Sequence, residues 1–161
     1  MPGVKETMEI AIQAEIDASK NYRKAAERIN LFLLKDKFQF LAKEEESHRR
    51  VLETLFEKKF PNENLVLPSV EDMPYREFGE YDVTPTMPLH EIIEKAMEGE
   101  QRAVEFYKAL ADMVDKEDEK KIARYLSAME ESHYHMLKSE LEMVQNFELY
   151  DEVHSMMHAG P

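Results

Sequence analysis

The sequence contains the string Glu-Glu-Ser-His twice, at residues 45–48 and at residues 130–133. The two copies are 85 residues apart (130 minus 45), and the same offset relates further identical residues on either side of them. These pairs are Glu15/Glu100, Ala18/Ala103, Tyr22/Tyr107, Ala26/Ala111, Leu41/Leu126 and Leu52/Leu137. Chance recurrence among glutamate-rich helices does not easily keep one register over such a length, so the offset predicts an internal duplication.

The positions of proline separate helical from non-helical parts of the chain. Five of the seven prolines lie between residues 61 and 88, and the other two are near the chain ends. Elsewhere apolar residues recur every three or four positions, which predicts helices over 4–29, 31–59, 88–114 and 118–147. We therefore expect one all-α domain over residues 1–161, a four-helix bundle with hairpin 4–59, a long crossover at 60–87, hairpin 88–147 and a C-terminal tail at 148–161.

Composition excludes several classes of function. The formal net charge of −13 argues against nucleic acid and anionic membranes as partners. No segment approaches the ~20 apolar residues of a membrane span, and the amino terminus lacks the apolar core of a signal peptide, so we expect a soluble, cytoplasmic protein. Because the chain has no cysteine, it cannot carry a Cys-ligated electron-transfer centre, and electrons for a redox reaction must come from elsewhere.

Each predicted helix carries one glutamate within its apolar stripe, and two of these glutamates are followed three residues later by histidine. The residues are Glu15, Glu45 with His48, Glu100, and Glu130 with His133. Four ionised carboxylates buried together would cost far more than a domain's ~5–15 kcal/mol of stability unless cations balanced them. No lysine or arginine interrupts the stripes, whereas two divalent metals would balance four carboxylates. The pattern therefore predicts a dinuclear metal site.

Glu44 also lies on the His48 side of its predicted helix, four residues earlier. Its counterpart at the repeat offset is Met129 rather than a carboxylate. We therefore expect Glu45, not Glu44, to be the ligand.

This set of residues resembles the ferritin-like di-iron carboxylate proteins, in which two helices each supply one Glu and two supply Glu-x-x-His. Within that superfamily the chain is most similar to the rubrerythrin group, in its short form without a rubredoxin domain, over the whole chain except the tail beyond about residue 147. The resemblance implies two bound iron ions, although manganese and zinc accept the same ligands. It also implies bridging roles for Glu45 and Glu130, terminal or chelating roles for Glu15 and Glu100, and one metal for each of His48 and His133.

The resemblance further implies an activity, since rubrerythrins reduce hydrogen peroxide to water with electrons from a rubredoxin-type donor. We therefore expect hydrogen peroxide or oxygen as oxidant, an external electron-donor protein such as a rubredoxin, and a homodimer in which hairpins could be exchanged. Tyr22 and Tyr107 lie seven residues after Glu15 and Glu100 on the same faces. They are expected to donate hydrogen bonds to ligand carboxylates on neighbouring helices, the alternative being tyrosines of the core with unrelated partners.

The sequence also leaves some interpretations open, including the function. Typical rubrerythrins have a further glutamate one turn after the third-helix ligand, where this chain has Ala103, so a ligand exchange through that glutamate is not expected. A ferroxidase or iron-storage protein of the ferritin type, and a non-catalytic metal-stabilised interaction module, are the alternative functions. His154 and His158 have the spacing of a metal-binding pair, but we expect them to belong to a mobile tail.

Overall fold

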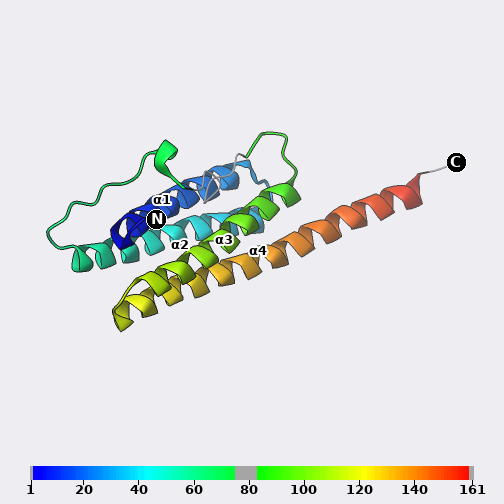
Figure 1. Ribbon diagram of the computed structural model, residues 1–161. Helices are drawn as coiled ribbons and strands as arrows, with labels where there is room; N and C mark the ends of the chain where they lie inside the picture. The colour runs from blue at the N-terminus through cyan, green and yellow to red at the C-terminus, as the bar shows by residue number, and fades with distance from the viewer. Residues whose placement is uncertain (1, 75–82, 160–161) are drawn as a thin grey trace.

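The computed structural model describes residues 2–74 and 83–159, which form four long helices (Figure 1). No β-strand is present in these two ranges. The helices are α1 (Val4–Arg28), α2 (Phe32–Lys59), α3 (Leu89–Met113) and α4 (Glu117–His158), with a short 3₁₀ helix, η1 (Val70–Asp72), between α2 and α3. The expected all-α bundle of two helical hairpins is confirmed.

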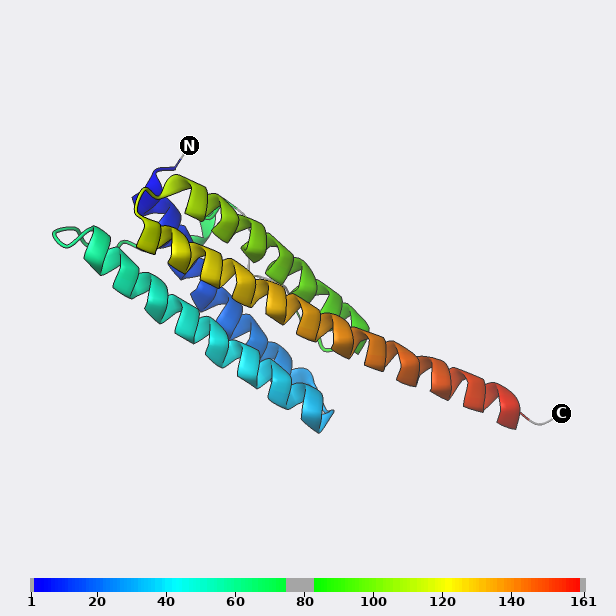
Figure 2. The ribbon, with the colours of Figure 1, turned by 90° about the horizontal axis from the view of Figure 1, so that it is seen from below.

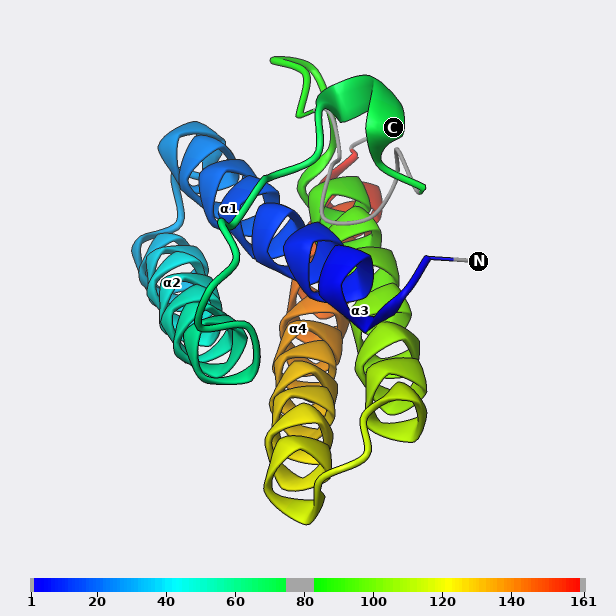
Figure 3. The ribbon, with the colours of Figure 1, turned by 60° about the vertical axis from the view of Figure 1, so that its left-hand side comes forward.

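The two hairpins lie side by side, with the first tilted relative to the second (Figure 1). Helix α1 packs along α2, and α3 packs along α4. The hairpins meet where α1 contacts α3 and where α2 contacts α4. Figure 3 shows the first of these contacts, where α1 crosses α3. Short turns, at residues 29–31 and 114–116, make the two helices of each hairpin antiparallel neighbours.

Two apolar clusters fill the bundle, one toward each end. Met8, Leu52 and Leu126 belong to one cluster, whereas Phe38 and Ile93 belong to the other. On every helix the glutamate predicted as a metal ligand lies in sequence between residues of the two clusters. The arrangement therefore places the polar residues in the middle of the bundle, with apolar layers on both sides.

The internal duplication extends to the packing within each hairpin. In the first hairpin the Ser19 hydroxyl donates a hydrogen bond to the carbonyl of Ala42, at 3.0 Å. In the second, the Ser127 hydroxyl donates to the carbonyl of Val104, also at 3.0 Å. At the repeat offset Ser127 corresponds to Ala42 and Val104 to Ser19, so the same two positions are joined with donor and acceptor exchanged. The helices of both hairpins therefore pack in one register.

The expected long crossover joins Lys59 to Leu89. Its first half is fixed to α1, because the backbone N–H of Val66 donates to the Glu9 carboxylate at 3.0 Å. Near its end, the Arg28 side chain donates to the carbonyl of Thr84 at 3.0 Å. Residues 75–82 of the predicted crossover lie outside the described residues.

The structure corrects the expected end of the fourth helix. Instead of stopping near residue 147, α4 continues without a break to His158 and extends past the other helices (Figure 2). The physical reason is local, since no glycine or proline occurs between 117 and 159 and apolar residues keep a helical spacing through Phe147, Tyr150 and Val153. His154 and His158 therefore lie on a helix, with ring centroids 4.3 Å apart. Residues 160–161 of the predicted tail are outside the described residues.

Candidate metal centre

All six residues singled out as metal ligands in the sequence come together, buried, in the middle of the bundle. They form two groups of four, and within each group one potential ligand atom per residue lies within 4.8 Å of all the others. The groups are Glu15, Glu45, His48 and Glu130, and then Glu45, Glu100, Glu130 and His133. Because Glu45 and Glu130 belong to both groups, the geometry is that of two adjacent sites sharing two carboxylates.

The Nδ1 atoms of the two histidines mark the two sites. His48 Nδ1 lies 3.0 Å from Oε1 of Glu130 and 3.1 Å from Oε2 of Glu45. His133 Nδ1 lies 3.1 Å from Oε2 of Glu130 and 3.4 Å from Oε1 of Glu45. Each shared carboxylate thus presents one oxygen to each histidine.

The two remaining glutamates complete one site each. Oε1 of Glu15 is 3.7 Å from His48 Nδ1, and Oε2 of Glu100 is 3.6 Å from His133 Nδ1. Atoms that bind one ion at about 2.1 Å are about 3.0–3.4 Å apart, so these separations suit a divalent metal with small adjustments. In the described chain no lysine or arginine forms an ion pair with any of the four glutamates, and the donor set therefore fits two metal ions.

Without metal, protons reduce the negative charge of the four clustered glutamates. Burial, and then the Glu45 charge, raises the pKa of Glu15 to about 8. Burial, followed by the charges of Glu45 and Glu100, also raises the pKa of Glu130 well above its usual value. Burial would raise the pKa of Glu100 too, but its hydrogen bonds, first with His133, outweigh burial and lower it. Glu15 therefore keeps a proton over part of the physiological pH range, and burial favours the protonated form of Glu130 as well.

The histidines are shifted toward their charged form. Burial by itself lowers the pKa of an imidazole, but hydrogen bonds with the surrounding carboxylates outweigh burial here. The pKa of His133 rises to about 12, and that of His48 rises strongly as well. A metal entering the site must consequently displace protons from the residues that would bind it.

Two tyrosines join the hairpins at the cluster. The Tyr22 hydroxyl on α1 donates to Oε1 of Glu100 on α3, and the Tyr107 hydroxyl on α3 donates to Oε1 of Glu15 on α1. Burial, and after it the Glu15 charge, raises the pKa of Tyr107 well above its usual value, which keeps it a hydrogen-bond donor. Each tyrosine therefore fixes the orientation of a carboxylate that belongs to the other hairpin.

A small cavity of about 30 Å³ lies beside the cluster between α1 and α3. Apart from the glutamates and Tyr22, its walls are made of small residues, namely Ala14, Ala18, Ala96, Gly99 and Ala103. A Cβ atom added at Gly99 would meet nothing within 4 Å, so this glycine leaves open space rather than allowing a close backbone contact. Since Ala18, Gly99 and Ala103 are only half-buried, the cavity reaches toward the surface between these helices.

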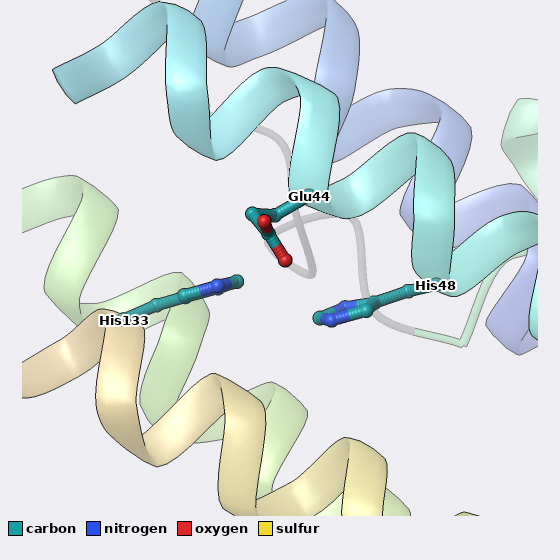
Figure 4. Close-up of side chains that lie close together, drawn as sticks. All are labelled: Glu44, His48 and His133. Carbon is teal, nitrogen blue, oxygen red and sulfur yellow. The ribbon is translucent and has the colours of Figure 1, made fainter.

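Glu44 lies close to both histidines of the cluster, which was not predicted from the sequence. Each of Glu44, His48 and His133 has one atom within 4.8 Å of the other two, and Figure 4 shows Glu44 directed toward both rings. The rings lie nearly parallel, with centroids 5.5 Å apart and planes 12° apart. Their Nε2 atoms are buried without a hydrogen-bond partner. The signal in the sequence is the i,i+4 spacing to His48, and the absence of a carboxylate at the equivalent position 129 argues against it.

Comparison with known proteins agrees with this geometry. The family model for rubrerythrin matches residues 6–141. The chain belongs to the rubrerythrin family. The match includes all six clustered residues and all four helices up to the middle of α4, so the expected resemblance is confirmed.

Two solved structures are similar over most of their length to this rubrerythrin-family chain. A hypothetical protein from Pyrococcus furiosus shares 33% sequence identity, with a TM-score of 0.76 over 90% of this chain and 92% of that one. A Thermotoga maritima structure described as a ferritin-like diiron-carboxylate protein is 18% identical, with a TM-score of 0.69 over 88% and 95%. The second likeness supports the ferritin-like form of the bundle. No curated protein matches the chain.

None of the described helices combines the length and the apolar character needed to cross a bilayer.

We expect Glu130→Gln to separate metal binding from folding. The substitution keeps the side-chain shape but removes a carboxylate shared by both sites, so metal content after reconstitution should fall below two ions per chain. The Tm of the metal-free protein should stay the same or rise by a few degrees, because burying a titratable carboxyl beside three other glutamates is costly without metal. Elemental analysis and thermal denaturation measure the two effects.

The matched control for this experiment is Glu46→Gln, on the same helix. Glu46 pairs with Arg23 near the surface and is in neither group of four. Equal metal loss in the two variants would contradict the assignment of the shared carboxylate.

The stability of the metal-free protein should fall as the pH rises. Folding raises the pKa of Glu15 from 4.5 to about 8 and that of His133 from 6.5 to about 12. A raised folded-state pKa gives stability that is complete below the unfolded value and is lost as the pH passes through the folded value. The lowered pKa of Glu100 acts in the opposite direction only at acidic pH.

Thermal denaturation of the chelator-treated protein between pH 6 and about pH 9 tests this, with a falling Tm expected. Added Mn(II) should stabilise the protein more at the upper end of this range, since metal then displaces fewer protons. A Tm that rises steadily with pH in the absence of metal would be the contrary result.

Proposed function

We propose that this protein is a di-iron oxidoreductase that reduces hydrogen peroxide to water with electrons from an external donor. The observation that carries the proposal is the division of the Glu45 and Glu130 oxygens between His48 Nδ1 and His133 Nδ1. Two carboxylates that each face two sites are suited to hold two metals close together. Membership of the rubrerythrin family supports iron as the metal.

In this proposal the six buried residues divide into shared and separate ligands. Glu45 and Glu130 would bridge the two ions. Glu15 and His48 would complete the ligands of one ion, and Glu100 and His133 those of the other. The hard carboxylate oxygens favour iron or manganese, and zinc would fit the same donors without redox chemistry.

The reaction requires two electrons and two protons, which convert one hydrogen peroxide into two water molecules. When bound, two ferrous ions supply the electrons, one each, so that the O–O bond is cleaved without release of a radical. Because the chain has no cysteine, we propose that a separate protein, such as a rubredoxin, returns these electrons.

The protein's own groups would position the ligands and hold protons. Glu15, with a pKa of about 8 in the metal-free state, and the Tyr107 hydroxyl that donates to it form a pair able to keep a proton at the cavity wall. Tyr22 and Glu100 form the equivalent pair from the opposite hairpin. We propose that Glu44 orients both imidazoles by accepting their second ring N–H groups through a water molecule.

The size of the cavity favours a small oxidant. One water molecule needs about 10–15 Å³ of such space, so about 30 Å³ has room for two bonded oxygen atoms and not for an organic substrate. A glutamate at position 103, as in typical rubrerythrins, would occupy part of this space. Ala103 therefore leaves room for the oxidant, with no further carboxylate competing for the metals.

An anaerobic Fe(II) titration followed by rapid mixing with an oxidant tests the proposal. Binding should saturate at two Fe(II) per chain, and hydrogen peroxide should oxidise the bound iron much faster than oxygen does. Near-ultraviolet absorbance in a stopped-flow instrument gives both rates. Uptake far beyond two ions with oxygen as the effective oxidant would favour a ferritin-type ferroxidase, and absence of redox activity would favour a structural metal site.

The variant Ala103→Leu tests the role of the cavity separately. A leucine there should fill the space between α1 and α3, leave the two-iron stoichiometry intact and slow oxidation by peroxide at least tenfold. Ala128→Leu serves as the control, because Ala128 is exposed on the outer side of α4. If Ala103→Leu and the control react at the wild-type rate, peroxide does not reach the metals through this cavity.

A further inference from the structure

The end of α4 forms an arm whose apolar residues are not covered within the described chain, and near its start the Glu148 carboxylate lies 3.3 Å from His90 Nδ1 on α3. Every residue from 145 to 158, hereafter the C-terminal arm, is exposed to solvent, and it projects beyond the bundle (Figure 2). The family match ends at residue 141, before the arm begins. An isolated helix of this length is only marginally stable in water, so a lone arm would be expected to fray unless something packs against it.

The arm is amphipathic although nothing covers it. Its six large apolar residues follow one another at helical spacing and occupy one half of the helix surface, and they are Phe147, Leu149, Tyr150, Val153, Met156 and Met157. The other half carries Glu148, Asp151 and Glu152, and the arm has no lysine or arginine. Met157, the most exposed of the apolar set, is 77% accessible. Such a stripe is typical of a helix that packs against another surface.

A second exposed apolar patch lies at the end of the bundle from which the arm departs. This patch, hereafter the hairpin tip, comprises residues 28–40 and exposes Leu31, Phe32, Leu33 and Phe40. Phe32 is 73% accessible although it begins a helix whose other face is buried in the core. The tip contains Arg28, Lys35 and Lys37 against one acidic residue, Asp36, so its charge is opposite to that of the arm.

We propose that the C-terminal arm of one chain packs on the hairpin tip of a second copy of the same chain, and that the exchange is reciprocal. Both surfaces are apolar, and an acidic arm complements a basic tip. Within one chain the same kind of contact is already present where the arm starts, since Lys37 pairs with Glu140 and Val144 belongs to the same cluster as Leu34.

The lengths involved agree with a two-fold arrangement. Each arm starts at the level of its own hairpin tip, and 14 helical residues extend about 21 Å. Two arms running antiparallel about a two-fold axis therefore bring the end of each arm to the hairpin tip of the partner. The contact is self-complementary and closed, which gives a dimer and not a filament.

Light scattering coupled to size-exclusion chromatography tests the proposal on the full chain. The wild-type protein should have twice the chain mass of 19.0 kDa at micromolar concentration. The double variants Val153→Ser/Met157→Ser in the arm and Phe32→Ser/Leu33→Ser in the tip should each have the mass of a monomer. Circular dichroism should show the bundle still folded, because none of these four residues is buried.

The control is Val66→Ser/Val70→Ser, which removes two equally exposed apolar residues from the crossover and should leave the dimer intact. A monomeric wild type would overturn the proposal and would indicate that the arm binds a different protein. A dimer that survives either the arm or the tip substitutions would also overturn it.

Crosslinking locates the contact, since the chain has no cysteine of its own. Met157→Cys and Leu33→Cys chains, mixed and oxidised, should give a disulfide-linked heterodimer on a non-reducing gel. If only Met157→Cys chains crosslink to one another, the arms pair with each other away from the tip, and the proposal fails.

Discussion

The burial of four glutamates in the centre of the bundle is the constraint that the rest of the structure must satisfy. Apolar clusters on both sides keep water away from Glu15, Glu45, Glu100 and Glu130. Tyrosines donate hydrogen bonds to Glu15 and Glu100 and both histidines lie beside Glu130, whereas Oε2 of Glu45 has no hydrogen-bond partner in the described chain. Without metal the charges are reduced by protons, as the raised pKa values of Glu15 and Glu130 show. Buried carboxylates of this kind lower the stability of the fold unless metal ions bind to them. The two apolar clusters must therefore supply the stability that the metal-free centre does not.

The duplication explains how two hairpins of one chain build a single centre. Tyr22 of the first hairpin donates to Glu100 of the second, and Tyr107 of the second donates to Glu15 of the first. Around them the α1–α3 interface consists of alanine and glycine residues that line a cavity, so these two hydrogen bonds are important links between the hairpins at this level. Sliding one hairpin past the other would break both bonds and separate the shared carboxylates from one histidine.

Much of this arrangement could be predicted because it follows from periodicity and register. The helix bounds agree with the expected ranges to within a few residues for α1 to α3, and the stripe positions correctly placed all six clustered residues and both tyrosines in the interior. The extension of α4 was not predicted, because chain ends are commonly disordered and residues 148–158 lie at the end of the sequence. These residues nevertheless contain no helix breaker. The cavity beside Gly99 and Ala103 depends on how the side chains of two hairpins fit together, which one-dimensional spacing does not determine.

One of the positions at which the two halves differ, residue 44, has a physical reason of its own. Glu44 and its counterpart Met129 are both half-buried, yet only one of them is a carboxylate. The rings of His48 and His133 lie nearly parallel and close together, so a single carboxylate beside them has an oxygen within 4.8 Å of both. A second carboxylate at position 129 would bring another negative charge toward the same pair of rings and raise the cost of burying both. If Glu44 orients both rings as proposed, a second carboxylate is not needed, and an apolar residue suits the equivalent position 129 better.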